Sequence, residues 1–96
     1  MYGLIGKIIC QPGYREQFSS LLLKAVPNMP GCLSYIIAND QADENTLWIT
    51  EVWATQELHR ASLSLPSIQA AIAEGRPMIA SFADRVETTP IGGNGL

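Results

Sequence analysis

Charged residues are scarce in this chain. They make up 16% of its 96 residues, against about 25% in a typical globular protein. The net charge is −3, and the basic residues are scattered singly along the sequence, at Lys7, Arg15, Lys24, Arg60, Arg76 and Arg85. No stripe of cations can therefore neutralise a row of phosphates, and we do not expect nucleic acid as a partner.

Long hydrophobic runs are also missing. The most apolar stretch, at the N-terminus, is far shorter than the ~18 residues of a membrane span, and no small-residue cleavage site follows it. We therefore expect a soluble cytoplasmic protein that makes no contact with a membrane.

Metal-binding patterns are absent too. The chain has two cysteines and one histidine, and Cys10 and Cys32 lack the paired spacing of zinc ligands. Without a secretion signal, two reduced thiols that behave as small hydrophobic residues are favoured over a disulfide. We expect no metal site.

Hydrophobic residues, in contrast, are abundant at 47%. A chain of this length forms one domain, here spanning residues 1–96, and it buries only about 60 to 70% of the surface that it exposes when unfolded. With so few charges, part of the apolar surface needs a partner. A homodimer is therefore predicted.

The hydrophobic pattern predicts four strands and two helical regions. The expected strands cover residues 2–11, 32–40, 46–54 and 79–89. A helix with Pro12 in its first turn stops before Pro27. A second helical region, capped by Thr55 and interrupted by Pro66, ends at Gly75 as a glycine cap. The order β-α-β-β-α-β is that of an α+β, ferredoxin-like fold: a four-stranded antiparallel sheet with both helices on one face. Two such sheets packed face to face would bury the other face.

The most informative segment, LWITEVWATQELHRASL, contains both tryptophans and the only histidine. Strand periodicity places Glu51 on the face of Trp53, and the helix that follows carries His59. A buried carboxylate needs a partner. Glu51 could orient and charge His59 as a general base, with Trp53 as an aromatic wall for a flat substrate. Alternatively, Glu51 and His59 form a structural pair, Glu51 pairs with Arg85, and the tryptophans only fill the core or a dimer interface.

Further polar residues share strand faces. Tyr35 and Asn39 lie on one face of the second strand, and Arg85 and Glu87 lie on one face of the fourth. Each pair could supply polar groups to a cavity or lie at a rim, and a rim position is favoured for Glu87. The tail motif GGNG only superficially resembles a phosphate-binding loop, because no helix follows it.

With these residues in place, nearly the whole chain resembles the antibiotic biosynthesis monooxygenase family of dimeric α+β barrel proteins, which includes small quinol monooxygenases. The resemblance rests on YGLIGKI with PGYREQF, on PGCLSYIIAND, on LWITEVWATQELH and on RPMIASFADRVETTPIGG. It implies oxygenation of an electron-rich aromatic, such as a quinol or anthrone, by O2 without metal, flavin, haem or another cofactor. His59 and Glu51 would be catalytic, and the substrate would contact Trp53, Tyr35, Asn39 and Arg85.

Two alternatives remain open. A non-catalytic dimer that binds a small ligand, or is purely structural, would share this fold. The haem-degrading branch of the superfamily is similar in carrying an asparagine on the first strand and a late histidine after a tryptophan. This sequence departs from that pattern in GLIGKIIC and SIQAAIAEG, so haem is not expected.

Overall fold

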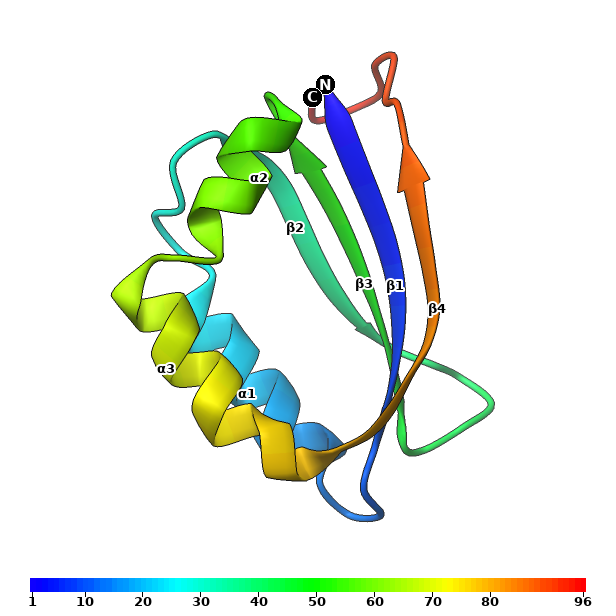
Figure 1. Ribbon diagram of the computed structural model, residues 1–96. Helices are drawn as coiled ribbons and strands as arrows, with labels where there is room; N and C mark the ends of the chain where they lie inside the picture. Colours follow the sequence, from blue (N-terminus) through cyan, green and yellow to red (C-terminus); the bar gives the residue numbers. More distant parts are fainter.

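The computed structural model describes residues 1–96 and shows one antiparallel sheet covered by helices on one face (Figure 1). The sheet has the strand order β2-β3-β1-β4. The predicted ferredoxin-like fold is confirmed, with the second helical region divided into two α-helices. The elements are β1 (Tyr2–Cys10), α1 (Arg15–Ala25), β2 (Cys32–Asn39), β3 (Thr46–Trp53), α2 (Gln56–Ser62), α3 (Pro66–Gly75), a short 3₁₀ turn (Arg76–Met78) and β4 (Ile79–Thr88).

The start of α1 differs from the expectation that Pro12 lies in the first helical turn. Gly13 has a φ of +83°, which is incompatible with a right-handed helix but suits a tight turn. The Pro12-Gly13 pair therefore forms the turn after β1, and the helix begins three residues later, at Arg15.

The division between α2 and α3 follows from capping and proline. The Thr55 hydroxyl accepts a hydrogen bond from the Leu58 backbone N–H at 3.2 Å, which satisfies a free donor at the start of α2. Leu65 is extended and Pro66 opens α3, because proline fits the first helical position but not a helix interior. These two start points were predicted correctly.

Gly75 ends α3 as predicted, but for a different reason. Its φ is −78°, so it does not adopt the left-handed conformation of a glycine cap. Instead, a β-carbon at this position would lie 2.7 Å from Cε1 of Phe18. Glycine is required here because α3 and α1 approach each other closely.

The strand register arranges the helix-covered face in rows. One row runs from Glu87 on β4 through Leu4 and Glu51 to Tyr35, and the next from Arg85 through Gly6 and Ile49 to Ile37. Beyond them lies the core, where Cys10, Leu47 and Phe18 from α1 are almost completely buried. The first row is unusual because it places polar side chains opposite one another under the helices.

The outer face of the sheet carries no helix (Figure 1). A row from Val86 through Ile5 and Thr50 to Ile36 crosses it. The three aliphatic side chains in this row are 52%, 36% and 55% exposed, in the order Val86, Ile5 and Ile36. This face therefore presents apolar surface to the solvent.

Cys10 and Cys32 are free, as predicted. They lie on β1 and β2, which β3 separates in the sheet. None of the helices is long and apolar enough to cross a membrane.

Candidate active site

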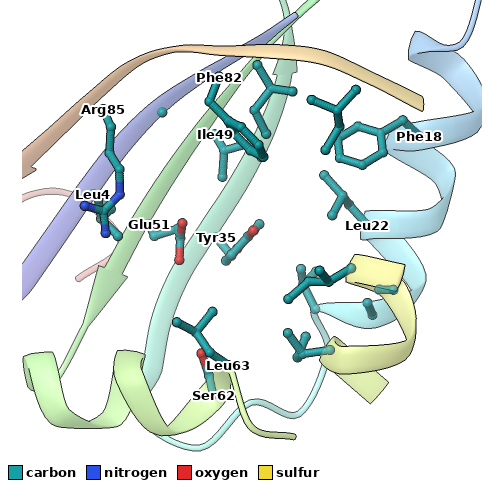
Figure 2. A pocket seen from close by; sticks show the side chains of 18 of the residues that line it. Leu4, Phe18, Leu22, Tyr35, Ile49, Glu51, Ser62, Leu63, Phe82 and Arg85 are labelled. Carbon is teal, nitrogen blue, oxygen red and sulfur yellow. The ribbon is translucent and has the colours of Figure 1, made fainter. Parts of the chain in front are cut away.

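A cavity of about 560 Å³ lies between the helix-covered face of the sheet and the helices. Hydrophobic residues make up 17 of the 26 that line it. Figure 2 shows Phe18 and Leu22 entering from α1, whereas Tyr35, Glu51 and Arg85 point into the cavity from the strands. The volume is in the range of small-molecule sites, which are mostly apolar with a few convergent polar groups.

Glu51 lies in the middle of β3 with its side chain only 15% exposed. Its Oε1 accepts a hydrogen bond from the Trp53 indole Nε1 at 3.0 Å. Burial raises the pKa of the Glu51 carboxyl, and this effect exceeds the opposing effects of the Trp53 hydrogen bond and the Arg85 charge. The carboxyl is therefore partly satisfied but remains easier to protonate than a carboxyl in water.

His59 projects from α2 toward the same cavity and is 12% exposed. Its ring packs near those of Tyr2 and Trp53, with centroid separations of 5.4 and 5.5 Å. Its Nε2 is 3.9 Å from Oε1 of Glu51, which is too far for a hydrogen bond. The two side chains are thus adjacent but not hydrogen-bonded to each other.

The expectation that Glu51 charges the imidazole is wrong. Burial lowers the pKa of His59, the positive charges of Arg85 and Arg60 lower it further, and only Glu87 opposes them. Neutral His59 is favoured at neutral pH, because its ordinary value is already near 6.5. A neutral imidazole is the form that can accept a proton.

Trp53 is among the residues that line the cavity, but it presents no exposed aromatic face. Its side chain is completely buried, with 0% exposure. A ligand in the cavity could stack on it only after the covering side chains had moved, and its observed contacts include the hydrogen bond to Glu51 and the edge-on packing against His59. Its burial supports the alternative that Trp53 is a core residue, and its indole N–H donates to the Glu51 carboxyl.

Tyr35 and Arg85 both line the cavity, as predicted. Burial, followed by the nearby Glu51 charge, raises the pKa of the Tyr35 hydroxyl, so that it remains a hydrogen-bond donor. The chain contains one contact of 4.0 Å or less between a basic nitrogen and a carboxylate oxygen, that of His59 with Glu51. No carboxylate oxygen therefore lies within 4.0 Å of the Arg85 guanidinium. The alternative of a direct Glu51–Arg85 ion pair is thus contradicted, and the guanidinium is unpaired.

Asn39 does not join the site. It ends β2 opposite Leu47, is exposed and is absent from the cavity lining. It does share a strand face with Tyr35, as expected, but four residues of extended chain carry it away from Glu51. Glu87 lies at the rim, as favoured, where the Tyr2 hydroxyl donates to its Oε2 at 2.7 Å.

Sequence reasoning missed Phe82, which lines the cavity and is 73% exposed (Figure 2). Simple alternation from Arg85 places residue 82 on the opposite face of β4. The register shifts between the pairs of Lys7 with Asp84 and Ile8 with Phe82, and this bulge turns the ring inward. Tyr2, which shares the strand face of Leu4, was also missed. It does not line the cavity, but its ring packs near that of His59.

Clusters of three or more histidine, cysteine, aspartate or glutamate side chains that could hold a metal ion are absent from the chain. Polar residues in the cavity lining include Glu51, His59, Tyr35 and Arg85. These groups can bind an anion, donate hydrogen bonds and accept a proton.

Comparison with solved structures shows close likeness over almost the full length. A protein from Chloroflexus aurantiacus, provisionally named an antibiotic biosynthesis monooxygenase, is 53% identical, with a TM-score of 0.95 over 97% of this chain and 95% of its own. A Pseudomonas aeruginosa protein has 17% identity and a TM-score of 0.82 over 95% and 94% of the two chains. A Deinococcus radiodurans protein with the same provisional name has 20% identity and a TM-score of 0.80 over 97% and 95%. The last two likenesses establish the fold alone.

No protein of curated function matches the chain. The sequence profile of the family described as antibiotic biosynthesis monooxygenase, however, matches residues 1–74. This range covers β1 to nearly the end of α3 and includes Tyr35, Glu51 and His59. The chain belongs to the antibiotic biosynthesis monooxygenase family.

Proposed function

We propose that this protein is a monooxygenase that oxidises a quinol, an anthrone or a similar electron-rich aromatic with O2, without a bound cofactor. The observation that carries the proposal is the convergence of Tyr35, Glu51 and Arg85, next to neutral His59, on a predominantly apolar cavity. An aromatic body fits the apolar walls, and its acidic hydroxyl or enol fits the polar end.

The proposed chemistry needs little beyond deprotonation. The anion of an anthrone can donate one electron to O2, and recombination of the resulting radicals forms a carbon hydroperoxide. Loss of water then leaves a ketone. In the sum, a CH2 group and O2 give a C=O group and H2O, and the substrate supplies all of the electrons. The protein has to bind the anion, exclude water and accept a proton.

The residues divide these tasks. In the proposal, His59 accepts the proton, because its pKa is lowered and the neutral ring is available. Arg85 stabilises the substrate anion, and the Tyr35 hydroxyl donates a hydrogen bond to it. Glu51, held by Trp53 at 3.0 Å, directs its remaining oxygen toward the substrate. Asn39 and Trp53 have no direct contact with the substrate.

We further propose that the protein works as a homodimer in which the outer sheet faces of two copies pack together. The exposed aliphatic row of Val86, Ile5 and Ile36 supports this proposal. A second copy is favoured over a different partner because the row crosses the whole sheet, and a two-fold axis through it would match the row with itself.

Oxygen uptake with anthrone or a reduced naphthoquinone tests the chemistry. The rate is measured with the protein, with heat-denatured protein and without protein, so that autoxidation can be subtracted. We expect consumption that saturates with substrate and is proportional to protein concentration. Tight binding of the aromatic without protein-dependent uptake would contradict the proposal and favour the ligand-binding alternative.

A further inference from the structure

Most glycines in or next to the regular elements have an evident packing reason. A β-carbon at Gly3 would lie 2.2 Å from the Thr88 hydroxyl oxygen, one at Gly31 would lie 2.4 Å from Cδ1 of Leu58, and Gly75 is packed against Phe18. Distances under 3.0 Å do not occur for real β-carbons. At these positions a larger residue would displace its neighbours.

Gly6, in the middle of β1, has no such reason. The nearest atom to a β-carbon at this position is the Asp84 carbonyl oxygen at 4.0 Å, which is ordinary van der Waals contact. Its φ is not positive, so the backbone does not demand glycine either. Glycine inside a strand costs about 0.5–1 kcal/mol relative to alanine, and it often marks a bulge, a bend, or the close approach of a ligand or another backbone.

The space over Gly6 belongs to the cavity. Gly6 lines it and lies between Arg85 on β4 and Ile49 on β3 in the register. The next row along the sheet contains Glu51 and Tyr35. The absent side chain therefore leaves a notch in the sheet floor that adjoins the polar groups, and an added side chain would point into it.

We propose that Gly6 is a specificity-determining residue whose bare backbone forms the floor under the ring system of the ligand. The ligand class is a flat phenol or enol of at least two fused rings, with its acidic hydroxyl directed between Arg85 and Glu51. This inference rests on the site of the proposed function but concerns binding, so it can be tested without turnover.

The test compares Gly6→Ala and Gly6→Val with the wild type in binding 1-naphthol, a redox-stable bicyclic phenol, by calorimetry. We expect Gly6→Ala to melt at the same or a higher temperature and to bind roughly 10-fold more weakly, the scale of one misplaced methyl group in a pocket. Gly6→Val should lose more affinity. The ether 1-methoxynaphthalene, which has no acidic hydrogen, should bind the wild type more weakly than 1-naphthol.

Gly3→Ala is the matched control, because it adds the same methyl group to the same strand where the β-carbon meets Thr88 instead of the cavity. It should lower the melting temperature and leave the affinity for 1-naphthol unchanged below that temperature. Unchanged affinity in Gly6→Ala, unfolding of Gly6→Ala, or a wild type that does not bind 1-naphthol would each overturn the inference. A wild type that binds 1-naphthol but consumes no oxygen with anthrone or a reduced naphthoquinone contradicts only the proposed chemistry and leaves the role of Gly6 standing.

Discussion

The two faces of the sheet depart from ordinary burial in opposite directions. The covered face holds Glu51 and Tyr35 partly buried where apolar side chains are the rule, whereas the outer face exposes Ile5 and Ile36 where polar side chains are the rule. Each departure costs stability in the isolated chain. We infer that each face is completed by another molecule, a small ligand on the covered side and a second copy on the outer side.

The largest effect is expected from a mutation in the outer face of the sheet, which should prevent dimer formation. Ile36→Lys places a charge in the proposed interface, and two-fold symmetry introduces it twice, so that several kcal/mol of association free energy should be lost. Sedimentation should change from about twice 10.4 kDa to a single 10.4 kDa chain. Ile91→Lys is the matched control, because Ile91 is 98% exposed in the tail and should not affect assembly. A wild-type protein that is already monomeric at micromolar concentration would refute the dimer.

The next effect concerns the covered face. His59→Ala should lower the turnover number about 100-fold or more, the scale of a lost general base. The mutant should keep its circular dichroism and its oligomeric state, because the imidazole makes no hydrogen bond to Glu51 at 3.9 Å. If melting temperature falls while turnover per folded molecule is unchanged, His59 is structural, and Tyr35 and Arg85 would then have to lower the pKa of the substrate and let water take the proton.

A smaller effect is expected at the unpaired cation. Arg85→Gln removes the charge facing the ligand anion. Loss of a charge-assisted hydrogen bond of about 1.5–3 kcal/mol should raise KM at least 10-fold. Arg60→Gln is the control, since Arg60 also lowers the pKa of His59 but does not line the cavity. Both variants should move the His59 titration to higher pH, observable by NMR because the chain has one histidine. Only Arg85→Gln should weaken binding.

The smallest effect is a change in pH dependence. Burial raises the pKa of Glu51 above its ordinary 4.5, so the folded state binds its proton more tightly than the unfolded state. The associated stability is fully present below pH 4.5 and is lost as the pH rises through the raised value. Glu51→Gln keeps an acceptor for the Trp53 indole and should melt higher than the wild type at pH 7 but not at pH 4. Turnover should fall less than in His59→Ala. A lower melting temperature at pH 7 would show that the charged form stabilises the fold.

Local pattern was enough to predict the elements and much of the site. The period of two placed Glu51 and Trp53 on one face of β3, and Thr55 and Pro66 set the starts of α2 and α3. The boundaries differ by only a few residues, with the largest difference at Arg15, where a glycine turn delays the helix.

The errors within the site arise from the three-dimensional arrangement of strands and helices, which the local sequence pattern does not contain. Asn39 shares a face with Tyr35, but distance along the strand separates it from the cavity, and a bulge that no local pattern predicts brings in Phe82. The Trp53 side chain was correctly placed on the inner face, yet whether that face meets a cavity or closed packing depends on the helices above it.

The sequence by itself determined the order of the elements, the face of each strand residue and the residue types available for chemistry, because hydrophobic period, capping and turn residues act over short distances along the chain. Only the tertiary structure decided which of those residues meet. The separation of His59 from Glu51 by 3.9 Å, the unpaired guanidinium of Arg85 and the open notch above Gly6 depend on sheet register and on how far the helices stand from the sheet. Those quantities arise from packing between segments distant in sequence, which no local pattern contains.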